Sequence, residues 1–317
     1  MAGKARGILF SLLVLTLIES SRAGSGIGTY WGQNTFEGSL NDACSSGLYS
    51  YVNIAFLNTF GSAQVPQLNL GGHCDPRYGQ CVGLTTDILN CQKLGIKVML
   101  SLGGPTGTYT LTSTEDAKNL AIYLWNNFLG GQSATRPFGT AVLDGIDFDI
   151  DLGSNQYYSD LARFLADYSK QGTKVYLSAT PRCTFPDSYM GTAISTGLFD
   201  FIWIKFYNNP ACEYAVGNIQ SLTSAWTKWT SSVPSSTMFL ELPASADAAT
   251  SGFIPTDILI NQIFPHVKTS PNYGGIMIWS RYYDSLSGYS KSVKGDVPQQ
   301  IELKSSLEDE GRSCSSA

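Results

Sequence analysis

The sequence predicts an α/β protein with a single (β/α)8 barrel, and three observations support this fold class. Eight short runs rich in β-branched and aromatic residues recur along the chain, and stretches of helix length separate most of them. Such alternation is typical of parallel strands joined by crossover helices. Residues 24–294 contain all eight units, which suits a barrel that typically takes ~250 residues as one domain. A doubly wound open sheet is the alternative, but no G-x-G-x-x-G motif follows the first expected strand.

Each element is expected from its local residue types, in chain order. Strands are expected where Val, Ile, Tyr and Phe cluster, because these residues favour a pleated, extended backbone. The eight strands are 27–31, 51–56, 97–102, 143–151, 174–179, 201–207, 238–242 and 275–279. The helices are expected at 86–94, 117–128, 156–171, 221–230 and 256–266. The C-terminal ends of the strands should meet at one mouth of the barrel, where such barrels hold their functional residues.

The first 23 residues have the pattern of a secretory signal peptide. Lys4 and Arg6 precede an apolar run at 8–18, and Ser21 and Ala23 are the small residues of a cleavage site. The run is too short to cross a bilayer, and no later apolar stretch approaches the ~18 residues that a membrane helix needs. We therefore expect a secreted protein, in the apoplast or the vacuole, that has no membrane partner.

Composition and charge narrow the classes of function. Charged residues make up only 14 % of the chain, the formal net charge is −5 and the isoelectric point is near 5.0. Because there is no basic surplus, the chain lacks the charge that neutralises phosphates in nucleic-acid binding. We therefore expect no nucleic-acid partner, and we expect a monomer.

Seven cysteines in an exported chain predict disulfides with one cysteine left over. The odd residue, Cys314, lies in the polar segment 295–317, which predicts a disordered tail after the barrel domain. No C-x-x-C motif is present and the only histidines are His73 and His266, so a zinc site lacks ligands and no metal or other cofactor is expected. Spacing alone does not select the pairing of the other six: Cys44, Cys74, Cys81, Cys91, Cys183 and Cys212.

The segment 143–151 carries a column of acids. Side chains of a strand alternate between its two faces, so Asp147, Asp149 and Asp151 share one face and the apolar residues between them share the other. In a barrel the apolar face packs against the helices, which turns the carboxylates inward. Same-face residues are ~6.6 Å apart along a strand, so the column rises toward the C-terminal mouth. Burying this much negative charge is costly, which indicates a function.

The acid column has two other interpretations, a solvated face of an antiparallel strand and a calcium-binding loop. An antiparallel strand with one solvated face can carry Asp at alternate positions, but it fits the strand–helix alternation badly. A calcium loop starting at Asp147 needs Gly at its sixth position and Glu at its twelfth, whereas the chain has Leu152 and Tyr158 there. A looser cation site stays open.

The same segment resembles the active-site strand of glycoside hydrolase family 18, D-G-x-D-x-D-x-E, and its flanks resemble plant class III (hevamine-like) chitinases. The resemblance covers residues from about 26 to about 288. The matching stretches are Tyr30-Trp-Gly-Gln-Asn, Tyr51-Val-Asn-Ile-Ala-Phe, Val98-Met-Leu-Ser-Leu-Gly-Gly, Phe206-Tyr-Asn-Asn-Pro and Tyr273-Gly-Gly-Ile-Met-Ile-Trp-Ser. It implies a TIM barrel that cleaves β-1,4-linked N-acetylglucosamine polymers with retention. The substrate's own acetamido oxygen then attacks the anomeric carbon, so no protein nucleophile is required.

The resemblance also implies roles for individual residues. In the family, the Glu that ends the motif protonates the leaving oxygen, and the Asp two residues earlier orients the acetamido group and exchanges a proton with the Asp below it. A Tyr at the end of strand six donates to the acetamido oxygen, and a Trp at the end of strand eight forms the floor under the sugar. These positions are occupied here by Asp151, Asp149, Asp147, Tyr207 and Trp279, with Tyr30, Phe56 and Gln33 expected to line the cleft.

Three residues depart from the family pattern at the mouth of the barrel. Asp151 stands where the family has Glu, so its carboxyl is set back by ~1.5 Å, the length of a C–C bond; a displacement of ~1 Å can cost about 100-fold in rate. Lys205 is expected to point inward with Tyr207 where relatives usually have Gln, and a cation favours the charged form of a carboxylate that should donate a proton. Glu241 replaces a usual Gly and is expected to pair with Lys205. The alternative is that Lys205 and Glu241 both point into solvent.

The resemblance further implies the disulfides Cys44–Cys91, Cys74–Cys81 and Cys183–Cys212, which leave Cys314 unpaired within the domain. Each would fasten loops at the rim of the cleft.

Two hypotheses about function follow. The first is an endochitinase of reduced activity that binds chitin or chito-oligosaccharides and needs no cofactor. The second is a catalytically silent member of the family: a seed storage or calcium-binding protein, a sugar-binding protein, or an inhibitor of another glycosidase such as a xylanase. Asp151 and Lys205 are the residues that separate them.

Overall fold

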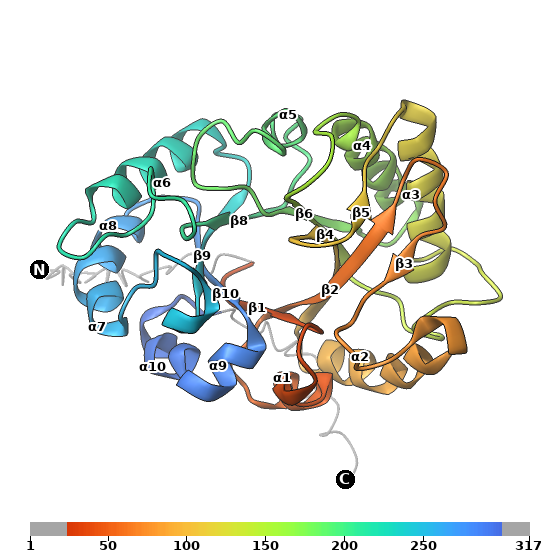
Figure 1. Ribbon diagram of the computed structural model, residues 1–317, viewed down its shortest axis with the longest axis horizontal. Helices are drawn as coiled ribbons and strands as arrows, with labels where there is room; N and C mark the ends of the chain where they lie inside the picture. Colours follow the sequence, from red (N-terminus) through yellow and green to blue (C-terminus); the bar gives the residue numbers. More distant parts are fainter. Residues whose placement is uncertain (1–23, 300–317) are drawn as a thin grey trace, which may run out of the picture.

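The computed structural model describes residues 24–299, so the expected signal peptide, 1–23, and residues 300–317 with Cys314 lie outside the described residues. Eight parallel strands form a closed barrel (Figure 1). The first strand pairs in parallel with both the second and the last, which closes the sheet. The predicted fold class is therefore confirmed. The barrel strands are β1 (Gly26–Trp31), β2 (Tyr51–Phe60), β4 (Lys97–Gly104), β6 (Gly145–Ile150), β7 (Tyr176–Ala179), β8 (Phe201–Lys205), β9 (Thr237–Pro243) and β10 (Tyr273–Trp279).

Helices surround the barrel (Figure 1). Four of the five expected helices are continuous: α2 (Leu84–Lys93), α3 (Thr114–Phe128), α4 (Tyr158–Tyr168) and α6 (Gln220–Ser232). The fifth is divided into α7 (Thr256–Ile258), a π-helical turn (Leu259–Ile263) and α8 (Phe264–Val267). Four further helices are too short to show an apolar repeat in the sequence: α1 (Leu40–Ser45), α5 (Gly191–Ile194), α9 (Arg281–Ser287) and α10 (Tyr289–Val293). Within residues 24–299, no helix has the length and apolar character of a membrane span.

The second barrel strand extends beyond the barrel at its C-terminal end. There β2 pairs with two strands of two residues each, β3 (Gln67–Leu68) and β5 (Thr108–Tyr109). Strands this short carry no periodic signal, so they are not predictable from the sequence pattern.

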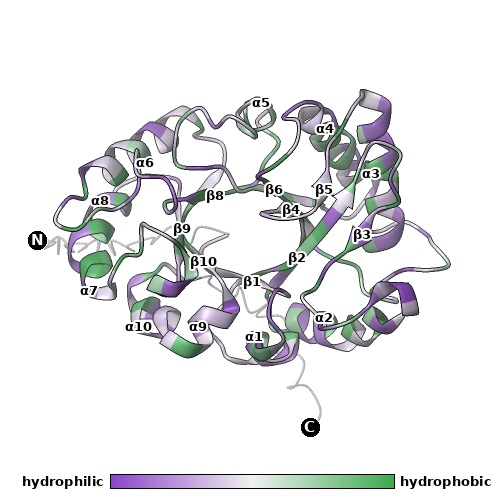
Figure 2. Ribbon diagram, in the orientation of Figure 1, coloured by the Kyte–Doolittle hydropathy of each residue, from purple (hydrophilic) through white to green (hydrophobic). Residues whose placement is uncertain are grey.

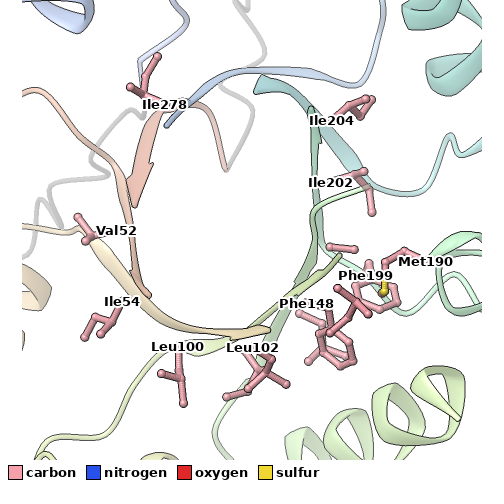
Figure 3. Close-up of a cluster of buried hydrophobic side chains, with 14 of the residues drawn as sticks. Val52, Ile54, Leu100, Leu102, Phe148, Met190, Phe199, Ile202, Ile204 and Ile278 are labelled. Atoms are coloured by element: carbon pink, nitrogen blue, oxygen red, sulfur yellow. The ribbon is translucent and has the colours of Figure 1, made fainter. Parts of the chain in front are cut away.

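Alternating side chains divide the core into two regions. Outward-facing residues such as Val52, Ile54 and Leu100 point away from the barrel axis toward the helices (Figure 3). Inside the barrel, a smaller cluster includes Tyr51 and Trp203, whose ring centroids lie 5.3 Å apart. Apolar colouring predominates along the barrel strands, whereas the surrounding helices carry both apolar and polar segments (Figure 2). The barrel interior is therefore a packed core that supports whatever lies above it.

The three expected disulfides are present: Cys44–Cys91, Cys74–Cys81 and Cys183–Cys212. The barrel domain also continues past residue 294. Lys294–Asp296 form a 3-10 turn, and Val297 is buried next to Gly275 of β10. Residues 295–299 therefore belong with the packed domain, whereas the sequence placed them in the tail.

Candidate active site

A pocket of about 580 Å³ opens at the C-terminal mouth of the barrel. Strand ends supply its functional side chains: Asp149 comes from β6, Lys205 from β8 and Trp279 from β10. Loops supply most of the rest. The pocket is lined by Pro105, Asp149, Asp151, Leu152, Arg182, Lys205, Tyr207, Asn208, Asn209, Pro210, Ala248 and Trp279.

The three aspartates of the column face the barrel interior at increasing height, as the alternation predicts. Asp147 is fully buried and accepts hydrogen bonds from Ser101 Oγ at 2.6 Å and Trp203 Nε1 at 3.1 Å, and another from Ser178. Asp149 is almost buried, and Asp151 at the top has a side chain that is 19 % exposed. Only the upper two can therefore contact a molecule in the pocket.

Lys205 joins the two upper aspartates. Its Nζ donates hydrogen bonds to Asp149 Oδ1 and Asp151 Oδ1, each at 2.7 Å, and its side chain is only 9 % exposed. A second cation, Arg182, lies with its guanidinium nitrogen 3.8 Å from Asp151 Oδ1 and packs on the ring of Tyr189. The top of the acid column is thus held by two positive charges. The alternative in which Lys205 points into solvent is wrong.

Burial and charge set the protonation behaviour of this cluster. Burial raises the pKa of Asp149 to about 7, although the Lys205 ammonium opposes this shift. Burial likewise raises the pKa of Asp147 against the hydrogen bonds that it accepts. For Lys205, burial disfavours the ammonium, but the facing charges of Asp149, Asp151 and Glu241 outweigh it and raise its pKa. Lys205 therefore stays charged, while a proton can reside lower in the column.

Glu241 on β9 is buried and has partners other than the one expected. Its Oε1 accepts a hydrogen bond from the Tyr207 hydroxyl at 2.6 Å, and its Oε2 accepts from the Tyr30 hydroxyl at 3.4 Å. The expected ion pair with Lys205 is wrong, because both carboxylate oxygens face tyrosine hydroxyls while the lysine side chain reaches Asp149 and Asp151. Burial raises the pKa of Glu241 well above its ordinary value, although the charge of Lys205 opposes this.

Three residues expected to line the cleft lie beneath or beside it. Tyr30 and Phe56 are buried, and their rings contact Trp279 at centroid distances of 5.4 and 6.0 Å. Both rings pack against the partly buried Trp279 and are themselves covered, so they support this tryptophan and do not line the pocket. The Gln33 amide donates to the backbone oxygens of Gly32, Ala55 and Asn69, so it fixes loops and does not line the pocket.

Several lining residues come from loops and could not be predicted from strand patterns. Arg182 follows the end of β7 by three residues, and Asn208, Asn209 and Pro210 follow Tyr207 directly. A search for polar residues within a few positions of each strand end could have found them, since loops after barrel strands carry function. Among residues 24–299, no group of three or more His, Cys, Asp or Glu side chains is arranged to hold a metal ion.

The closed barrel and the acid column on its fourth strand define a protein of the glycoside hydrolase class. A family model described as "Glycosyl hydrolases family 18" matches residues 27–257, and the chain belongs to this family.

Curated relatives and solved structures agree. An acidic endochitinase of Vitis vinifera is 57 % identical over 293 residues, covering 92 % of this chain and 97 % of the relative, and one of Cicer arietinum is 55 % identical, covering 93 % and 99 %. The chitinase ICChI from Ipomoea carnea superposes with a TM-score of 0.83 at 49 % identity, covering 86 % of this chain and 99 % of that one. A xylanase-A-amylase inhibitor protein, XAIP-III, superposes with a TM-score of 0.82 at 44 % identity, covering 86 % of this chain and 99 % of that one. A tamarind chitinase-like lectin gives 0.76 at 37 %, covering 85 % and 99 %.

Proposed function

We propose that this chain binds oligomers of β-1,4-linked N-acetylglucosamine in the mouth pocket and hydrolyses them much more slowly than relatives that have Glu at position 151. One observation carries the proposal: the buried Lys205 ammonium lies between Asp149 and Asp151 at 2.7 Å from each. The proposed reaction needs no cofactor.

Binding is supported by the shape and lining of the pocket. Its volume of about 580 Å³ is in the range of small-ligand sites, and an aromatic ring, Trp279, meets polar side chains there. Relatives more than 50 % identical over nearly their whole length carry the name endochitinase. The expected substrate class, chitin or chito-oligosaccharides, follows from that kinship.

Slow turnover is supported by the state of the acid position. A general acid must hold a proton and reach the leaving oxygen. Asp151 Oδ1 already accepts a hydrogen bond from Lys205 Nζ at 2.7 Å, and Arg182 lies 3.8 Å from the same oxygen, so two cations occupy the oxygen that would have to face the leaving group. Its side chain is also one methylene shorter than that of Glu. Lys205 also occupies Asp149 Oδ1, which leaves a single oxygen of that carboxylate for the acetamido group.

A sugar-binding protein without turnover is the second candidate, and the same Lys205 contacts favour it. Solved neighbours include proteins described as an inhibitor and a lectin. The two candidates differ in whether Asp151 still functions as an acid. A calcium-binding role predicts saturable heat when calcium is titrated into the protein.

The test compares the wild type with Asp151→Glu and with a matched control, Asp167→Glu, whose side chain is 64 % exposed in an ion pair with Lys170. Calorimetry with chitopentaose should give saturable heat for all three proteins. Hydrolysis of a soluble chitin derivative should be slow for the wild type and the control, and about 10- to 100-fold faster for Asp151→Glu. Absence of saturable heat for the wild type would overturn the binding proposal. Unchanged hydrolysis by Asp151→Glu, with binding intact, would leave the silent sugar-binding protein.

We also propose export after cleavage behind residue 23, followed by function as a monomer. Expression with the native leader should yield an extracellular or vacuolar protein that starts at Gly24 by intact mass. Size-exclusion chromatography with light scattering should then give the mass of one chain. Retention of the leader, or the mass of a dimer, would contradict the respective statement.

A further inference from the structure

We propose that Glu241 is a specificity-determining residue that removes the pocket's preference for an N-acetyl group, so that the site also takes β-1,4-linked glucose oligomers. The inference rests on the proposed function, because it concerns the sugar unit next to Asp149 and Tyr207 in the same pocket. It goes beyond that function by naming a second class of ligand and the residue that admits it.

Glu241 is placed so that it can act only through the tyrosines around it. It is 1 % exposed, and its Cα partner on the neighbouring strand is Lys205. Its carboxylate accepts from Tyr207 at 2.6 Å and from Tyr30 at 3.4 Å. Tyr30 also makes a 2.8 Å hydrogen bond with Thr180. Glu241 therefore cannot touch a bound sugar and is a positioning residue for the hydroxyl of Tyr207.

The hydrogen bond between Glu241 and Tyr207 fixes the polarity that Tyr207 shows to the pocket. A phenol has one proton, and while Glu241 is ionised Tyr207 donates this proton to its Oε1. Only lone pairs of Tyr207 then remain for a ligand, although this side chain lines the pocket. An acetamido carbonyl is also an acceptor and finds no donor here, whereas a sugar hydroxyl can donate to Tyr207.

The ammonium of Lys205, which lies beside Asp149, does not restore a preference for the N-acetyl group. Two of the three Lys205 protons are donated to Asp149 and Asp151. The third can meet a carbonyl or a hydroxyl oxygen equally well, because both are acceptors. The Tyr207 hydroxyl, which could select an N-acetyl carbonyl by donating to it, is therefore turned away by Glu241.

The experiment measures the ratio of the dissociation constants for cellotetraose and chitotetraose by calorimetry. The wild type should bind both within about fivefold. Glu241→Met cannot accept the phenol proton, so Tyr207 becomes free to donate, and the ratio should favour chitotetraose by about 10- to 100-fold. Glu241→Leu, which likewise cannot accept the phenol proton, is the second variant, used if the methionine variant does not fold. Glu115→Gln, with a side chain that is 68 % exposed, is the matched control and should leave the ratio unchanged.

Combining variants separates this role from a merely structural one. Tyr207→Phe alone should leave the ratio near that of the wild type, because the hydroxyl does not face the ligand as a donor. Tyr207→Phe combined with Glu241→Met should abolish the preference that Glu241→Met creates. A wild type that already prefers chitotetraose more than tenfold, or a ratio that Glu241→Met does not change, would overturn the inference and leave the proposed function standing. A wild type that binds neither sugar would overturn both.

Discussion

Replacing Lys205 by the neutral Gln in the Asp151→Glu background should restore an acid to the mouth of the barrel. Asp149 Oδ1 and Asp151 Oδ1 each lie 2.7 Å from the same nitrogen, so the two oxygens are no more than twice that distance, 5.4 Å, apart. Without the ammonium, two carboxylates ~5 Å apart at an effective dielectric constant of ~20 repel each other by about 3 kcal/mol. That repulsion corresponds to about two pKa units, so the pair should retain one proton to a higher pH.

The expected shift of the pH profile follows from this change in pKa. At a pH above the pKa of the acid, a shift of about two units increases its protonated fraction by up to about 100-fold. Initial rates with a fluorogenic chitotriose derivative, measured from pH 4 to 9, should show the alkaline limb of Asp151→Glu/Lys205→Gln about two pH units above that of Asp151→Glu. Lys170→Gln, at a side chain that is 78 % exposed, serves as the control. Superimposable pH profiles for the single and double variants would refute the reasoning.

Three further predictions concern stability and pH. Burial raises the pKa of Asp149 to about 7, so between about pH 4 and 7 the native state holds a proton that the unfolded chain has lost. The free energy of unfolding should therefore fall as pH rises through that window. Urea denaturation of the wild type across this range should show the fall, and Asp149→Asn should lack it. Removing the Cys44–Cys91 disulfide, which spans 47 residues, should cost about 4 kcal/mol in the same assay. Burial raises the pKa of Glu241, whose neighbours are Lys205, Asp149, Asp147, Tyr207 and Tyr30. Protonated Glu241 can donate to Tyr207, which frees the Tyr207 proton for a ligand. The preference for chitotetraose over cellotetraose should therefore rise as pH falls.

Each of the three predictions has a result that would contradict it. Equal pH dependence of unfolding in wild type and Asp149→Asn would show that Asp149 does not bind a proton differently in the two states. A loss below about 1 kcal/mol without the disulfide would contradict the loop-entropy estimate. A sugar preference that is flat from pH 4 to 8 would contradict the Glu241 switch.

Much of the fold and the acid column could be predicted because alternation along a strand is a local property. The spacing of Asp147, Asp149 and Asp151 gives their shared face without knowledge of the neighbours. The inward direction of Lys205 likewise follows from its offset of two residues from Tyr207. The boundaries were less accurate: the fourth barrel strand ends at Ile150, so Asp151 already belongs to the loop.

The partners of these side chains could not be predicted, because alternation gives a face but neither the height in the barrel nor the reach of the side chain. Glu241 has Lys205 as its neighbour on the adjacent strand, yet the long lysine side chain extends to Asp149 and Asp151. Tyr30 faces the interior as expected but lies too deep to line the pocket. Arg182 reaches the site from a loop, whose course depends on tertiary packing.

The most direct test of the account is a crystal structure of the wild type soaked briefly with chitotetraose and then flash-cooled. The account predicts an intact oligomer in the mouth pocket, with Lys205 Nζ still between Asp149 and Asp151 and the Asp151 carboxyl out of hydrogen-bond reach of the glycosidic oxygen, beyond about 3.5 Å. Asp151 within hydrogen-bond distance of that oxygen, with Lys205 displaced from between the two aspartates, would contradict it.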